Sequence, residues 1–72
     1  MVYPLFRKNS IGNSVYKILS DNEFIEKQRI GKNVLEHEIE AKQYPEMLLI
    51  QDMIECKANT FHEITILEYE NF

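Results

Sequence analysis

The chain has 72 residues, which is one small domain that hides only about 60% of its unfolded surface, so its size excludes a second core or a deep substrate cavity. Twelve acidic against eight basic residues give a net charge of −4, which disfavours direct binding of nucleic acid because such binding relies on neutralising phosphates. Hydrophobic residues make up 44% of the chain, a share typical of folded proteins. We expect a single domain over residues 1–72.

Neither a membrane span nor a secretory leader is predicted. A spanning helix needs roughly 20 consecutive apolar residues, whereas the longest apolar run here is 47–50. The first residues lack the basic region and apolar stretch of a signal peptide, and the single cysteine, Cys56, can form no internal disulfide. These observations favour the reducing cytoplasm.

Residues 2–19 predict a hairpin. Residues 2–8 are β-prone, and Pro4 confines them to a strand start or a sheet edge because proline has no amide hydrogen. Residues 9–14 are rich in turn formers, and residues 15–19 favour a second strand. Residues 2–5 would then form a sheet edge of low polarity.

Residues 20–27 carry two conflicting signals. Ser20 and Glu23 have the spacing of a capping box, which would begin a helix at Asp21. The alternation of apolar and polar residues after Phe24 instead predicts a strand. We favour a bend or a single helical turn followed by a strand, and a helix over residues 21–27 remains the alternative.

Residues 24–41 predict a second hairpin with its bend at Lys32-Asn33. This register sorts charged and apolar groups together, in the cross-strand pairs Arg29–Glu36, Lys27–Glu38, Ile30–Leu35 and Phe24–Ala41. A shift by one residue would place Glu26 opposite Glu38 and would turn the apolar groups to the wrong face.

Residues 45–56 predict the main helix, with Pro45 in the first turn, where its missing amide hydrogen costs nothing. At 100° per residue one half of the helix is apolar and should pack on the sheet: Met47, Leu49, Ile50, Met53, Ile54 and Cys56. Leu48 falls in the polar half, which makes it a candidate exposed apolar residue.

The predicted fold class is α+β. After an extended segment at 60–64, Thr65 and Glu68 repeat the capping-box spacing and predict a short C-terminal helix. We expect a mostly antiparallel sheet of about four strands in two hairpins, packed on the 45–56 helix, with the short C-terminal element closing an edge.

No catalytic, cofactor or metal site is predicted. His37, His62 and Cys56 lack the paired spacing that a zinc site needs. Cys56 lies on the apolar half of the helix, where burial would blunt its nucleophilicity. An enzyme that uses Cys56 or a pair of carboxylates therefore ranks last among the functions considered.

Three acidic residues alternate on one strand face: Glu36, Glu38 and Glu40. Such a row can mimic a phosphate array or hold a cation. It can equally be a solvated face, and cross-strand pairing with Lys27 and Arg29 already accounts for two of its members in the predicted register. The second interpretation is favoured.

The spacing of certain residues along nearly the whole chain resembles that in a group of other proteins. These residues are Tyr16-Lys17-Ile18, Phe24, Gln28, Gly31, Tyr44-Pro45-Glu46, Ile50-Gln51-Asp52-Met53 and Phe61-x-Glu63-Ile64-Thr65-x-x-Glu68-Tyr69. This spacing is similar to that of a group of short bacterial proteins, chiefly from Bacteroidetes, that carries no assigned activity. The resemblance implies a stand-alone small cytoplasmic protein, and it transfers no site residue.

Two functions follow from these patterns. The first is a non-enzymatic module that binds another protein, or a second copy of itself as a homodimer, with Leu48 or the low-polarity edge at residues 2–5 in the contact. The alternative is an acidic inhibitor or immunity-type protein that uses Glu36, Glu38 and Glu40 to occupy a basic nucleic-acid-binding site on a target protein.

Overall fold

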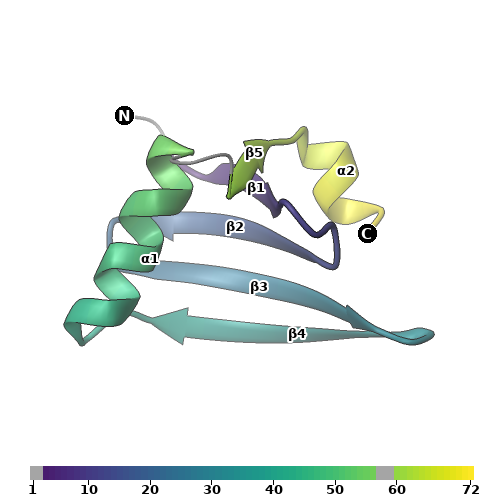
Figure 1. The fold of residues 1–72 in the computed structure, drawn as a ribbon, viewed down its shortest axis with the longest axis horizontal. Helices are drawn as coiled ribbons and strands as arrows, with labels where there is room; N and C mark the ends of the chain where they lie inside the picture. Colours follow the sequence, from purple (N-terminus) through teal and green to yellow (C-terminus); the bar gives the residue numbers. More distant parts are fainter. Residues whose placement is uncertain (1–2, 57–59) are drawn as a thin grey trace.

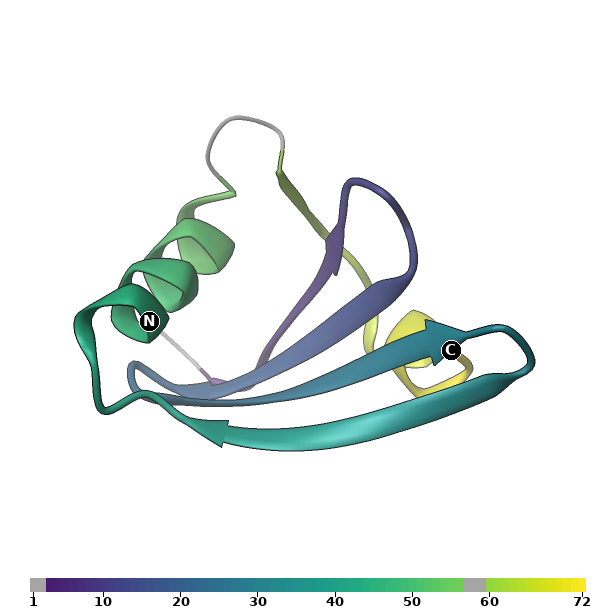
Figure 2. The same ribbon diagram turned by 60° about the horizontal axis from the view of Figure 1, so that its bottom comes forward.

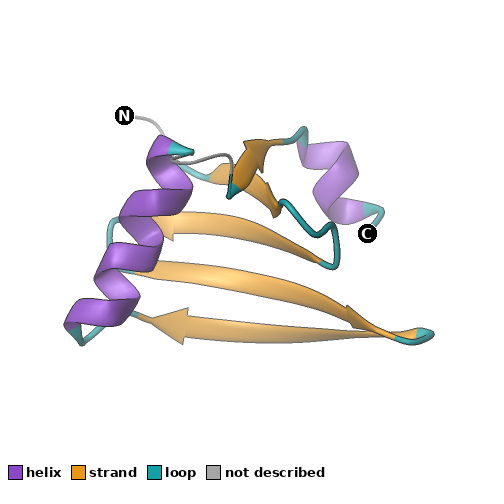
Figure 3. Ribbon diagram, in the orientation of Figure 1, coloured by secondary structure: helices purple, strands orange, loops and turns teal. Residues whose placement is uncertain are grey.

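The computed structural model describes residues 3–56 and 60–72, and it confirms the predicted α+β class (Figures 1 and 3). Its elements are β1 (Leu5–Asn9), β2 (Ser14–Ser20), β3 (Glu23–Ile30), β4 (Asn33–Glu40), α1 (Tyr44–Glu55), β5 (Phe61–Glu63) and α2 (Ile66–Glu70). The strands form one five-stranded antiparallel sheet in the order β4-β3-β2-β1-β5. The sheet therefore has one strand more than expected, and that strand lies within the predicted extended segment at 60–64.

The first strand begins directly after Pro4, so the predicted strand start is confirmed, but the predicted sheet edge is wrong. β1 lies between β2 and β5, and its residue Arg7 is paired with Glu63 of β5. The Ile64 amide also donates to the Phe6 carbonyl at 3.3 Å. Within the described residues the two edges are β4 and β5, and Val2 of the predicted low-polarity edge lies outside that part of the chain.

Residues 21–22 form a turn and residues 23–27 belong to β3, so the helical alternative is wrong. The Ser20 hydroxyl donates to Asn22 Oδ1 at 2.7 Å and accepts from the Asn22 amide at 3.3 Å. These bonds stabilise a tight turn between β2 and β3 instead of a helix start. The alternation after the turn then brings Phe24, which is only 2% exposed, under α1.

The second hairpin forms, but its predicted register is wrong by two residues. The turn is Gly31-Lys32, so Lys27 lies opposite Glu36 and Arg29 lies opposite Val34. Gly31 has a φ of 62° and takes the first position of the two-residue turn, where positive φ favours glycine. A shift by two residues leaves each side chain on its predicted face. The need for a residue with positive φ in the turn outweighs the exposed charge pairs, which contribute only about 0.2–1 kcal/mol each.

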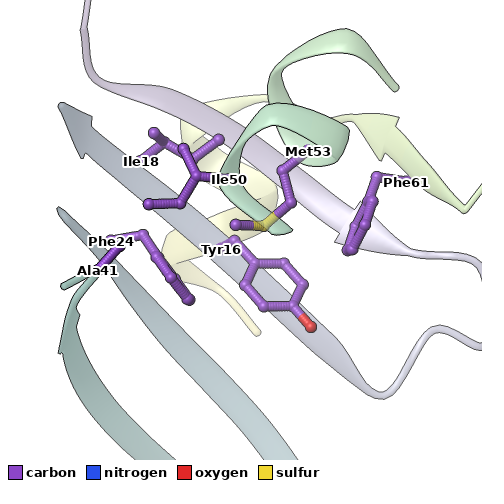
Figure 4. Close-up of a cluster of buried hydrophobic side chains, with 7 residues drawn as sticks. All are labelled: Tyr16, Ile18, Phe24, Ala41, Ile50, Met53 and Phe61. Atoms are coloured by element: carbon purple, nitrogen blue, oxygen red, sulfur yellow. The ribbon is translucent and has the colours of Figure 1, made fainter. Parts of the chain in front are cut away.

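The main core lies between α1 and one face of the sheet, here called the α1 face. Ile50 and Met53 of α1 are fully buried in it. The sheet contributes Tyr16, Ile18, Phe24 and Phe61, and Ala41 follows directly after β4 (Figure 4). The rings of Tyr16 and Phe61 meet edge to face, with centroids 5.5 Å apart, which adds to the burial of their apolar area.

Less of α1 is buried than predicted. Met47 and Leu49 were expected in the core but are 48% and 36% exposed. The helix crosses one end of the sheet (Figures 1 and 2), so a narrow line of its side chains reaches the α1 face. At its last turn the Arg7 guanidinium donates to the carbonyls of Met53 at 2.8 Å and Ile54 at 3.3 Å, which supplies donors that a helix end lacks.

The short helix α2 packs on the opposite face, here called the α2 face, which carries Phe6, Val15 and Lys27. Thr65 Oγ1 accepts from the Glu68 amide at 3.1 Å, so the predicted helix start is confirmed. Tyr69 is buried, with its ring centroid 5.3 Å from that of Phe6. The C-terminal element thus covers a sheet face rather than closing an edge, because Tyr69 finds an apolar surface there.

Candidate functional site

The outward surface of α1 gathers exposed apolar side chains. Tyr44, Met47 and Leu48 are 72%, 48% and 45% exposed, and their spacing puts them on one side of the helix together with Gln51. With Asp21, from the turn between β2 and β3, they line a hollow of about 250 Å³. We call these five residues the α1 hollow. The structure thus places Leu48, the residue singled out by the sequence, inside a group of apolar neighbours.

The chemistry of the α1 hollow suits docking more than catalysis. Three of its five lining residues are mainly apolar, while the Asp21 carboxylate and the Gln51 amide provide polar groups. It is smaller than typical small-molecule pockets, which hold about 300–1,000 Å³. A single large side chain of a binding partner would fill it.

The acidic row is on the α2 face of β4, and all three carboxylates are exposed. In the observed register Glu36 lies opposite Lys27, but Glu38 faces Ile25 and Glu40 faces Glu23. Cross-strand neutralisation, expected for two of the three residues, is therefore found for one.

A neighbour along the chain adds little neutralisation to this row. Lys42 Nζ lies 3.3 Å from Glu40 Oε1, and both side chains are more than half exposed. Pairs of this kind contribute about 0–1 kcal/mol in solution. With Glu23 added, the row becomes an acidic patch at the α1 end of the β3–β4 hairpin.

The residues weighed for metal binding lie on separate elements. His37 is on β4, His62 is on β5, and Cys56 ends α1 with a left-handed backbone, φ 52°. Within residues 3–56 and 60–72, no three His, Cys, Asp or Glu side chains come together in a way that could hold a metal ion. The Cys56 thiol donates to the Met53 carbonyl at 3.7 Å, which gives it a structural contact.

One buried polar cluster was missed by the sequence analysis. Tyr16 and Ser14 are 7% and 1% exposed. Burial raises the pKa of Tyr16 to about 12, and the negative charge of nearby Glu26 acts in the same direction. The phenol stays protonated at neutral pH, which is the reverse of what a nucleophile or base needs. The alternation of 14–18 could have placed Tyr16 in the core, but its pairing with Glu26 depended on the register.

No protein-family model, curated protein or solved structure matches this chain. The similarity to short bacterial proteins therefore stays a prediction. No helix in the described residues is long and apolar enough to cross a membrane.

Proposed function

We propose that the protein is a non-enzymatic module that binds another protein through the α1 hollow. The observation that carries this proposal is the joint exposure of Tyr44, Met47 and Leu48 on one side of α1. Contiguous exposed apolar surface is a mark of interaction sites, whereas single exposed apolar residues are common everywhere. Tyr and Met are also enriched in protein interfaces.

The surface of the molecule is large enough for an interface with a macromolecular partner. A standard interface covers about 800 Å² on each protein, and this protein exposes 4931 Å² in total. A partner centred on the hollow would thus cover surface well beyond its five lining residues. The net charge of −4 disfavours nucleic acid in that role. We place this activity in the cytoplasm, where an unpaired Cys56 stays reduced.

A comparative pull-down tests the proposal. The tagged protein and its Leu48→Asp variant are incubated with lysate of the source organism at low and high salt, and the captured proteins are identified by mass spectrometry. The control is Leu67→Asp, since Leu67 is 64% exposed on α2, away from the hollow. We expect a partner that survives high salt, is lost with Leu48→Asp and is kept with Leu67→Asp. Equal capture by all three proteins would contradict the proposal.

Self-association is the form of this proposal in which the partner is a second copy. Two copies that bury their hollows against each other would form a symmetric dimer, the commonest small oligomer. Light scattering at micromolar concentration should then give twice the mass of the chain, and Leu48→Asp should return the monomer. A monomer in the unmodified protein removes this form.

An acidic inhibitor of a nucleic-acid-binding protein is the second candidate. It is favoured by the observed register, which leaves Glu38 and Glu40 without cross-strand cations and adds Glu23 to their patch. Complexes steered by charge weaken as salt screens them. Lysine substitution of Glu36, Glu38 and Glu40 together should abolish such an interaction, and a partner that still binds this variant would remove the candidate.

A further inference from the structure

The outer edge of β4 is an open row of backbone hydrogen-bonding groups. β4 is eight residues long and ends the sheet, with no strand on its outer side in the described residues. The Ala41 amide donates to the Asn22 carbonyl at 2.7 Å, so the odd-numbered residues of β4 bond inward to β3. The N–H and C=O groups of the even-numbered residues point outward: Val34, Glu36, Glu38 and Glu40.

An exposed edge of this length is a template for another strand, and proteins commonly block such edges with charge. The side chains of Glu36, Glu38 and Glu40 lie on the α2 face, beside the outward backbone groups. If β4 paired antiparallel with the β4 of a second copy, its outward-bonding, even-numbered residues would have to lie opposite even-numbered residues of that copy. Two registers then give the longest overlap. They place Glu36 opposite Glu36 or Glu38 of the second copy, and like charges directly opposed are destabilising. The acidic row thus disfavours pairing of this edge with a second copy.

We propose that β4 accepts an extended segment of a partner protein as an antiparallel sixth strand, with basic residues at alternate positions and apolar residues between them. This binding is independent of the α1 hollow and goes beyond it. The open backbone groups supply the hydrogen bonds, as in other cases of strand addition to a sheet edge. The acidic row selects the basic residues, whose side chains would lie on the α2 face opposite the three glutamates.

The inner side of β4 shows this complementarity at Glu36 and at Ile39, although not at Glu38 or Glu40. There β3 places Lys27 opposite Glu36 on the α2 face and Phe24 opposite Ile39 on the α1 face. On the outer side the α1 face of β4 again presents apolar groups, since Leu35 is 44% exposed and Ile39 is half-buried. An incoming strand with apolar residues at the intervening positions would cover both. A one-residue slip would put its basic side chains on the apolar face, so the alternation fixes the register.

The probe is a synthetic peptide of alternating lysine and valine with blocked ends, titrated into the protein up to millimolar concentration. Two N-methylated versions separate strand pairing from charge attraction, because both keep the full charge. Methylation of the lysine amides removes the hydrogens that would point at β4 and should abolish binding. Methylation of the valine amides, which would point away from β4, should leave binding within about twofold of the parent peptide.

Amide hydrogen exchange locates the contact. In the free protein the amides of Glu36, Glu38 and Glu40 should exchange fast and those of His37 and Ile39 slowly, because the second group is bonded to β3. The peptide should slow the three glutamate amides at least tenfold. A peptide that binds without slowing these amides, or that binds equally after methylation of its lysine amides, would overturn the proposal, as would the absence of binding.

Substitutions in the protein complete the test. Glu38→Gln should weaken peptide binding by up to about fivefold, which is the scale of one opposite-charge cross-strand pair. Glu38→Pro removes an outward amide at an edge that tolerates proline, and it should abolish binding while the fold persists. Leu48→Asp should bind the peptide unchanged. A loss with Leu48→Asp but not with Glu38→Pro would place the peptide in the α1 hollow and overturn strand addition.

Discussion

The two hairpins of the sheet follow similar alternating patterns but differ in what covers them. In the β1–β2 hairpin, Val15 and Ile18 are buried, with 1% and 0% exposure, because α1 and α2 lie on opposite faces of these strands. In the β3–β4 hairpin, every residue of β4 except Ile39 is exposed. An alternating pattern therefore puts apolar side chains on one face of a strand, but they are buried only where another element packs on that face. The β1–β2 hairpin is thus the covered hairpin. The β3–β4 hairpin is the open hairpin, whose core contact is limited to residues near Phe24 and which carries the acidic row and the free edge.

The open hairpin joins the core at Phe24 and Ile39, but near its turn it is held by contacts with the C-terminal segment. Lys27 Nζ donates to the Tyr69 carbonyl at 3.0 Å and lies 4.2 Å from the Tyr69 ring centroid. Arg29 Nη2 donates to the backbone oxygen of Phe72 at 2.9 Å and stacks over the Phe72 ring at 4.2 Å. Both basic side chains of β3 thus bind the C-terminal segment, which leaves the carboxylates of β4 less neutralised.

The largest expected effect tests where stability lies within the β3–β4 hairpin itself. Phe24→Ala should lower the free energy of unfolding by about 3–5 kcal/mol, because Phe24 is buried under α1. Leu35→Ala, on the same sheet face but 44% exposed, should cost less than about 1 kcal/mol. Urea denaturation followed by circular dichroism measures both. Equal losses for the two variants would show that the hairpin is covered along its whole length.

The next effect concerns how the covered hairpin holds α1. Arg7→Met keeps the apolar stem but leaves the carbonyls of Met53 and Ile54 without their guanidinium donor. We expect a loss of about 2–3 kcal/mol in the free energy of unfolding, the scale of hydrogen bonds to a charged group. The matched control is Lys32→Met in the exposed turn of the open hairpin, which should be nearly neutral. An Arg7→Met protein as stable as the control would refute the role of Arg7 as a helix cap.

The third effect is a pH dependence of the core. The pKa of Tyr16 is raised to about 12 by burial and by Glu26, above the ordinary value near 10 of the unfolded chain. The contribution of the protonated Tyr16 phenol to the free energy of unfolding is therefore fully present below about pH 10. It is lost as the pH rises toward about 12, and the loss is at most about 2.5 kcal/mol. Tyr16→Phe should lose less stability across this window. Urea midpoints of the two proteins that fall in parallel from pH 9 to 12 would contradict this assignment.

The fold was predictable from the sequence where the signals are local. The helix start at Thr65 depends only on residues three apart, and its N-cap hydrogen bond is confirmed. The similar spacing at Ser20 gave a turn instead, because a strand that buries Phe24 against α1 gains more than a helix start would. The register of the β3–β4 hairpin failed because charge pairing was weighed above the backbone of the turn, where Gly31 fixes the geometry.

The candidate sites were less predictable, since they depend on contacts between distant segments. Leu48 stood out by its place on the helix, but the hollow around it also needs Asp21, which the β2–β3 turn brings near α1. The acidic row was visible in the sequence. Its lack of neutralisation was not, because that follows from the register and from the binding of Lys27 and Arg29 to the C-terminal segment.

The smallest effect is that of Glu23→Lys on the free energy of unfolding. Its sign distinguishes the observed register of the open hairpin from the register predicted by charge sorting. In the structure Glu23 lies opposite Glu40, so Glu23→Lys replaces a like-charge pair with an opposite-charge pair and should raise the free energy of unfolding by about 0.2–1 kcal/mol. In the register expected from charge sorting, Glu23 would face Lys42, and the same substitution would destabilise. The gain should shrink in a Glu40→Gln background, since the cross-strand partner is then neutral. A destabilised Glu23→Lys protein would argue for the charge-sorted register, and with it for backbone groups of β4 that bond differently from those described.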